Sequence, residues 1–165
     1  MTLSERVARV GLRWHQRAVV RRWPDASEAP FEITVSSNAV GPEGANSALA
    51  VELALAMVDD IHRVGMRAAV KIDDEHLFAL VDAEVQVSLD GEAPTDSELV
   101  DFAQGWGHDY LMGYLRVGLA DSAAQIGVSN VALPPSYVTQ PSEEAAFSLV
   151  ADARERAAAE TDEES

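Results

Sequence analysis

The sequence of 165 residues contains no cysteine and is poor in basic residues. It has 12 Lys and Arg against 28 Asp and Glu, which gives a net charge of −16. The absence of cysteine excludes a disulfide framework, a thiolate zinc site and a cysteine nucleophile. The shortage of positive charge argues against a nucleic-acid-binding face on the body of the protein, because phosphate binding needs clustered Lys and Arg.

Long apolar stretches are also missing. The longest uninterrupted run has six residues, from Leu53 to Val58, whereas a membrane-spanning helix needs roughly 20 and the apolar region of a signal peptide about 7 to 15. We therefore expect a cytoplasmic protein that does not insert into membranes. A chain of this length can bury one core without metal or disulfide support. We predict a single domain over residues 1–158 and a disordered acidic tail over residues 159–165.

The sequence has no nucleotide-binding loop of the Walker type, no dinucleotide fingerprint, no G-x-S-x-G and no H-E-x-x-H motif. Asp and His residues cluster in 59–62, 73–76 and 108–109, but their spacing matches no recognised metal site. Such residues are common in loops and helix caps. We expect a protein that is not an enzyme and that binds neither a cofactor nor a metal.

Positive charge is concentrated at the start of the chain, where residues 1–22 carry six Arg and one Glu. The apolar residues of this segment fall at helical spacing: Leu3, Val7, Val10 and Trp14. The pattern predicts a short basic amphipathic helix, with a strand following over 16–23. We expect the helix to dock on the acidic body of its own assembly; the alternative is an arm that contacts a membrane surface or phosphates.

Alternation of apolar and polar residues predicts further strands. With the segment above, they supply a four-stranded sheet: 16–23, 31–37, 66–72 and 78–89. The stretch 47–64 is ambiguous, because its Ala, Leu, Glu and Met favour a helix capped by Gly65, whereas its odd-numbered apolar residues also alternate as in a strand. We favour the helix.

Helical signals dominate after residue 94. Thr95 and Glu98 are spaced as a capping box, and apolar residues at steps of three and four then predict one aromatic-rich face: Leu99, Ala103, Trp106, Tyr110, Tyr114 and Val117. The glycines of this segment indicate close packing or a break near Gly107. A last helix is predicted to start at residues 141–144 and to bury Phe147 and Val150.

Several short motifs follow one another in this half of the chain: Pro94-Thr95-x-x-Glu98-Leu99, Tyr110-Leu111-x-x-Tyr114-x-Arg116, and Val131-x-Leu133-Pro134-Pro135. In their order they resemble the SecB family of export chaperones, particularly the members that serve toxin-antitoxin systems. The resemblance implies an α+β fold in which a four-stranded antiparallel sheet carries helices on one side. It also implies a homotetramer built as a dimer of dimers.

The function that the resemblance implies is that of an ATP-independent holdase for unfolded polypeptides. The tail over 160–164 is similar to the family's tail, which contacts the translocation motor, and an antitoxin is a further expected partner. A competing hypothesis is a non-catalytic adaptor or phage-related protein that uses the same fold on a folded partner. The predicted client-binding residues lie on the aromatic helix face and in the adjacent rigid loop: Trp106, Tyr110, Leu133, Pro134, Pro135 and Tyr137. Trp106 and Tyr110 fit a subunit interface equally well.

Overall fold

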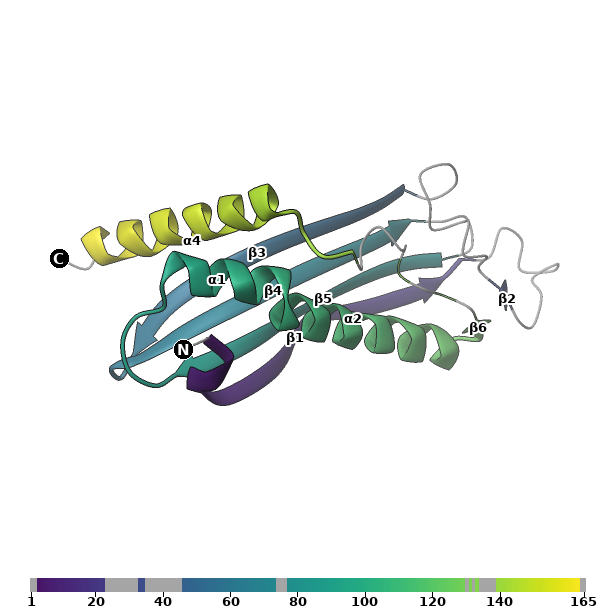
Figure 1. Cartoon of the computed structure of the whole chain (residues 1–165). Helices are drawn as coiled ribbons and strands as arrows, with labels where there is room; N and C mark the ends of the chain where they lie inside the picture. The colour runs from purple at the N-terminus through teal and green to yellow at the C-terminus, as the bar shows by residue number, and fades with distance from the viewer. Residues whose placement is uncertain are drawn as a thin grey trace.

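Four long antiparallel strands form the framework of the computed structural model (Figure 1). They lie in the order β1-β5-β4-β3, with β1 spanning Val7–Arg21, β3 Asn46–Val58, β4 Ile61–Asp73 and β5 Leu77–Leu89. A separate parallel pair joins β2 (Ile33–Thr34) to β6 (Val128–Ser129). The structure describes residues 3–22, 33–34, 46–73, 77–129, 131, 133 and 139–163. None of the helices in these ranges is long and apolar enough to cross a membrane.

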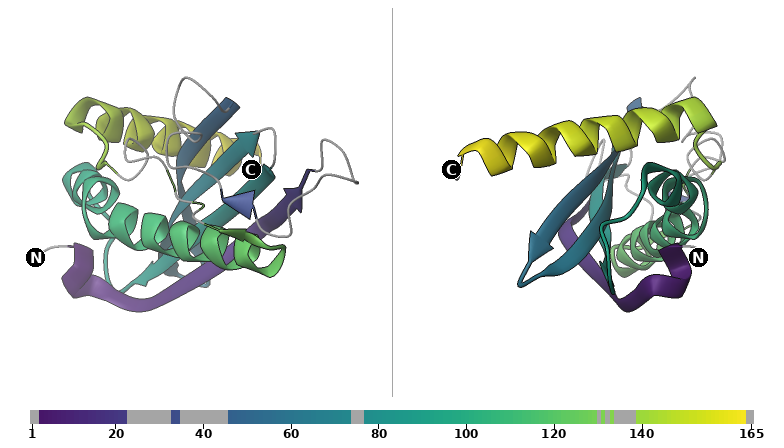
Figure 2. Two further views of the ribbon diagram at one scale, coloured as in Figure 1. Left: turned by 90° about the vertical axis from the view of Figure 1, so that its right-hand side faces the viewer. Right: turned by 60° about the vertical axis from the view of Figure 1, so that its left-hand side comes forward.

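The core lies on one face of this sheet, which we call the inner face. Every second residue of β5 is buried there, and the side chains are Leu77, Ala79, Val81, Ala83, Val85, Val87 and Leu89. The alternate residues of β5 point to the outer face and include Asp82, Glu84, Gln86 and Ser88. This period of two is the pattern of a sheet covered on one side only. Figure 2 shows α1 and α2 together on that covered side.

The helix predicted over 47–64 is wrong, because this stretch forms β3, a turn and the start of β4. Asp59 and Asp60 adopt positive φ angles of 52° and 60° in the turn, which is the conformation that a two-residue hairpin requires. Pairing along the whole length of β4 overrides the helix propensity of Ala and Leu. Gly65 is therefore a strand residue and not a cap.

The fourth strand of the sheet also differs from the prediction. The predicted strand 31–37 is described only at Ile33–Thr34, where it pairs with β6 outside the main sheet; the rest of it lies outside the described residues. Its expected place in the four-stranded sheet is taken by β3. The four-stranded antiparallel sheet itself is confirmed.

The predicted amphipathic helix at the N-terminus is wrong. Leu3–Arg6 forms a short 3-10 helix, and β1 then runs to Arg21 along β5. The apolar residues from Val10 onward also alternate with period two, and pairing with the central strand decides in favour of a strand. The segment does contact acidic groups of its own chain, since Arg6 lies 3.0 Å from Glu98 and Arg17 pairs with Asp121.

The capping box at the start of α1 (Asp96–Gln104) is confirmed, because Thr95 and Glu98 exchange hydrogen bonds. The helix breaks at Gly105, as the glycines indicated, and α2 spans Trp106–Gln125. The break rotates the buried stripe, so that α2 buries Leu111, Leu115 and Leu119 in place of the predicted aromatic face. Trp14 of β1 fills the space above the absent side chain of Gly118, which brings α2 close to the sheet.

The last helix, α4, spans Glu143–Glu163 and packs across β3. Val150 is buried as predicted, whereas Phe147 is exposed. The helix continues through Glu163, although the sequence predicts disorder from residue 159. In Figure 2 the C-terminal end of α4 projects away from the other helices.

Candidate functional site

A groove separates the edge strand β3 from α4. It consists of two adjoining hollows of about 500 and 580 Å³, which share Val51 of β3 and Leu149 of α4. Because β3 is the last strand of the sheet, its inner-face residues have a neighbour on one side only. Leu53 is completely buried, but Leu49 and Val51 remain half-exposed beyond it. The groove therefore exposes part of the apolar inner face that would otherwise belong to the core.

The larger share of apolar lining belongs to the hollow near the start of α4. Leu49 and Val51 form one wall, and Ala145, Ser148 and Leu149 form the other. His108, at the start of α2, is almost fully buried and also lines this hollow. The helix residues follow the i, i+3, i+4 spacing of one helical face. This end of the groove fits apolar side chains.

Hydrogen bonds fix the entry of α4 and so the width of the groove. The Gln104 side-chain amide donates to the Pro141 carbonyl at 3.2 Å, and the Gln140 amide reaches the Asp109 carboxylate of α2 at 3.4 Å. The Ser142 hydroxyl accepts from the backbone N–H of Ala145 and caps the helix. These contacts make the groove a preformed feature of the fold.

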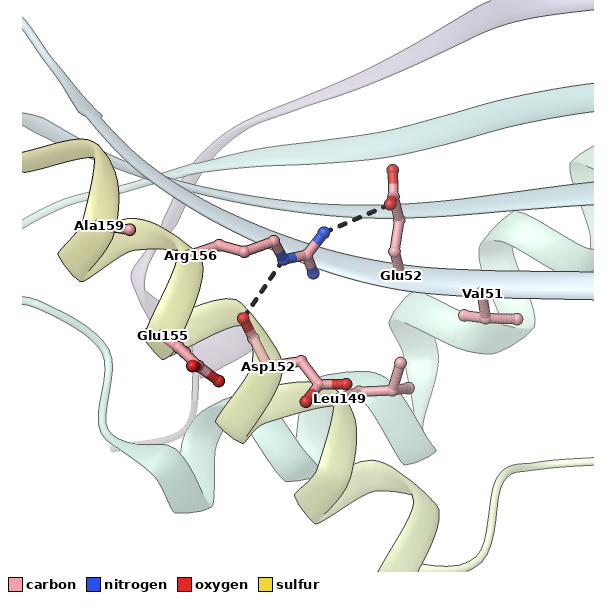
Figure 3. Close-up of a pocket in the computed structure, with 7 residues that line it drawn as sticks. All are labelled: Val51, Glu52, Leu149, Asp152, Glu155, Arg156 and Ala159. Atoms are coloured by element: carbon pink, nitrogen blue, oxygen red, sulfur yellow. Dashed lines mark hydrogen bonds and ion pairs between the residues drawn. The ribbon is translucent and has the colours of Figure 1, made fainter. Parts of the chain in front are cut away.

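The other end of the groove is charged (Figure 3). Arg156 of α4 lies 3.4 Å from the Glu52 carboxylate of β3 and donates to the backbone carbonyl of Leu53 at 2.7 Å. Asp152 and Glu155 line the same hollow. Three carboxylates and one guanidinium line this end, which gives it a net negative charge.

The three predicted client-binding residues that the structure describes, Trp106, Tyr110 and Leu133, do not line this groove. Trp106 packs edge-on against Phe102 with ring centroids 4.9 Å apart, Tyr110 is exposed on α2, and Leu133 is buried with 5% of its surface accessible. The other predicted residues lie outside the described ranges: Pro134, Pro135 and Tyr137. The groove residues of β3 were missed because their stretch was assigned to a helix, although their alternation was the signal that could have found them.

A second apolar surface runs along α2 and β1, and we call it the β1–α2 surface. Trp14 and Tyr114 stack at its centre with ring centroids 4.5 Å apart. The neighbouring side chains on the same faces are exposed, 50% at Tyr110 and 68% at Val117 on α2, with Val10 and Leu12 on β1. Exposed apolar side chains gathered in this way are typical of an interaction surface.

No group of three or more metal-ligating side chains occurs within the ranges that the structure describes. Asp59 and Asp60 form the hairpin turn, and Nδ1 of His108 lies 3.4 Å from the Asp109 carboxylate.

Comparisons with known proteins bear on the fold. No protein-family model matches the sequence, and no curated protein matches it in a sequence comparison. Among solved structures, it is similar to the Mycobacterium tuberculosis Rv1957 SecB-like chaperone, in complex with a ChAD peptide from the Rv1956 HigA1 antitoxin. The TM-score is 0.50 at 16% identity, and the match covers 79% of this chain and 91% of that chain. The chain has a SecB-like α+β fold, as the sequence predicted.

Proposed function

We propose that the protein is an ATP-independent chaperone that holds extended apolar segments of unfolded polypeptides in the groove between β3 and α4. The observation that carries this proposal is the exposed apolar inner face at Leu49 and Val51, opposite Leu149. Clients of this chemistry include unfolded segments of exported proteins and of antitoxins. The similarity to a SecB-like chaperone supports the proposal at the level of the fold.

The size of the groove is compatible with reversible binding. Burying about 300 Å² of a client's apolar surface contributes about 7 kcal/mol at about 25 cal/mol per Å², and ordering the client offsets part of it. The net gain is then below the about 8 kcal/mol of a 1 μM complex, so dissociation constants of roughly tens of micromolar or weaker follow from such a balance. The carboxylates of Asp152 and Glu155 at one end favour clients that carry positive charge beside their apolar residues.

We further propose that a second copy of the chain covers the β1–α2 surface and that the assembly is a tetramer. The exposed Tyr110 and Val117 would be buried in this interface. This assigns Tyr110 to subunit contact, the alternative that the sequence left open, and assigns client capture to the groove, whereas Trp106 packs on Phe102. Burial of this surface between copies leaves the groove accessible, because α4 and β3 lie at the opposite edge of the sheet.

The test is suppression of aggregation of a chemically unfolded model protein, followed by light scattering without nucleotide. The wild type is expected to delay aggregation at near-stoichiometric ratios. Leu149→Ser, which removes an apolar wall, and Ala145→Gln, which fills the groove with a neutral side chain, are expected to weaken client binding about tenfold. Phe147→Ser is the matched control, since Phe147 lies on the same helix, is exposed, and does not line the groove.

The variants must keep the wild-type melting temperature within a few degrees for the comparison to hold. Equal client binding by wild type, Leu149→Ser and Ala145→Gln would contradict a role for the groove. If the wild type delays aggregation of no unfolded protein but binds one folded protein stoichiometrically, the adaptor hypothesis replaces the chaperone.

A further inference from the structure

The outer face of the sheet collects arginines that have no acidic partner, although the chain has more than twice as many acidic as basic residues. Within the described ranges, four arginines make neither an ion pair nor a hydrogen bond: Arg9, Arg13, Arg63 and Arg116. Arg116 is exposed on α2. The other three lie together on β1 and β4, on the side of the sheet that faces away from α1 and α2. Charges of one sign gathered on one surface create a local potential that attracts ligands of the opposite charge.

The pairing of the strands brings two of them to one hollow. Arg9 of β1 and Arg63 of β4 both lie opposite Ser88 of the intervening strand β5. In the next row Gln86 lies opposite Gly11, which has no side chain, and a hollow of about 220 Å³ opens over these residues. Its lining consists of two guanidinium groups, a hydroxyl, a side-chain amide and glycine backbone. Such a lining is rich in hydrogen-bond donors.

One of these donors is buried without a partner. Nε of Arg63 is inaccessible to solvent and makes no hydrogen bond to any described residue. A buried donor left unpaired is costly, so the Arg63 side chain is held here without the hydrogen bonds that would balance its charge. The hollow beside it is lined by guanidinium, hydroxyl and amide groups that can donate to an anionic, acceptor-rich group.

Two carboxylates of β5 on the outer face are already engaged. Glu84 lies 2.8 Å from Nε2 of His15, and Asp82 forms a bidentate ion pair with Arg67 at 2.6 and 2.8 Å. The hydrogen bond that Arg67 donates to the Asp82 carboxylate raises the pKa of Arg67, so its guanidinium stays positively charged. Arg13 lies opposite Glu84 and extends the positive charge beyond the hollow.

The other neighbours of the hollow are apolar or lie at its end. Val58 and Ile61 follow Arg63 toward the hairpin on the outer face, and both are exposed. Asp59 and Asp60 are confined to the turn itself. A ligand at the hollow therefore meets arginines first and apolar side chains next.

We propose that this outer-face hollow binds an acidic peptide segment of a partner protein, with a carboxylate seated between Arg9 and Arg63 and an apolar residue against Val58 and Ile61. Carboxylates accept two parallel hydrogen bonds from a guanidinium group. A nucleic acid fits less well, because its phosphates continue past the hollow onto a protein of net charge −16. The site lies on the opposite face of the sheet from the β3–α4 groove and does not depend on client capture.

The experiment measures fluorescence anisotropy of the intact protein with a labelled peptide of alternating Glu and Leu, at about 50 mM salt. The same peptide with Gln in place of Glu and a 20-base-pair DNA duplex are the other two probes. The variant Arg9→Gln/Arg63→Gln is expected to weaken Glu-peptide binding at least tenfold. Arg116→Gln, which removes an equally unpaired charge on α2, is the matched control and is expected to change the affinity less than twofold.

Preference for the Glu peptide over the Gln peptide, lost in the double variant and weakened by salt, supports the site. Equal binding of the Glu peptide by the double variant and by the wild type would overturn it. DNA binding that is tighter than peptide binding and lost in the double variant would assign the hollow to nucleic acid. Because Leu149→Ser leaves this hollow intact, that groove variant should bind the Glu peptide as the wild type does.

Discussion

Single side chains of this protein serve more than one element, and Glu98 is the clearest case. Its carboxylate accepts from the Thr95 backbone N–H at 2.9 Å and from Arg6 at 3.0 Å, so it caps α1 and ties the N-terminal segment to it. The hydrogen bond from Thr95, followed by that from Arg6, holds the pKa of Glu98 below its usual range. The stabilisation that Glu98 provides is therefore present above the ordinary pKa and is lost as the pH falls through the lowered value.

Replacing Glu98 by Gln tests this linkage. Gln can still complete the capping box, but it cannot pair ionically with Arg6. We expect Glu98→Gln to lower the free energy of unfolding by about 1 kcal/mol at pH 7 and to lose that deficit toward pH 3. Urea denaturation at both pH values measures the difference. A deficit that stays constant between pH 7 and pH 3 would contradict the assignment.

At the scale of elements, the approach of α2 to β1 depends on glycine. A Cβ at Gly118 would collide with the indole of Trp14, whereas a Cβ at Gly113, earlier in the same helix, would meet nothing within 4 Å. The helix propensity gained by Ala over Gly is about 1 kcal/mol at either position. We expect Gly113→Ala to raise the melting temperature and Gly118→Ala to lower it. Equal shifts from both substitutions would show that Trp14 does not rest on Gly118.

The elements also show how far the sequence alone predicts this fold. The β5 strand and the α1 capping box were predicted because their signals are local: alternation in one, Thr95 and Glu98 in the other. The β3 strand was missed because its small and long apolar residues satisfy both periods, and only pairing with β4 decides between them. The first half of the N-terminal strand was missed for a similar reason, because its pairing with β5 decides between the two periods, whereas its second half was predicted as part of the strand 16–23.

Whether the candidate site could be predicted depended on whether the strands and helices that form it were assigned correctly. A groove between a strand and a helix is predictable only when both elements are assigned, and the strand was the missing half. The aromatic residues of α2 were predicted to bind clients because their large side chains fall on one face of a continuous helix. The break at Gly105 then rotated Tyr110 out of the core, which no periodicity across the break could reveal.

At the scale of the whole molecule, the β1–α2 surface leads to a prediction on assembly. We expect light scattering to report several times the 17.7 kDa mass of one chain. Val117→Glu places a charge in the proposed interface and should lower the measured mass, because burying an unpaired carboxylate is unfavourable. Phe147→Glu, at an exposed apolar residue of α4, is the control and should leave the mass unchanged. A wild-type protein with the mass of a single chain would contradict the tetramer.

The hydrogen bond from Arg156 to the Leu53 carbonyl would, under the proposed function, affect how a client dissociates. An edge strand presents unpaired backbone groups, and an extended chain can hydrogen-bond to them as an additional strand. Unfolded chains are the best candidates for this strand addition. If the groove holds clients as proposed, the occupied Leu53 carbonyl in the middle of β3 cannot pair with the client's backbone, so the client would be held mainly through its side chains. Arg156→Gln should therefore slow the dissociation of a labelled client measured by stopped-flow dilution. Under the proposed function, the guanidinium would thus keep client binding reversible.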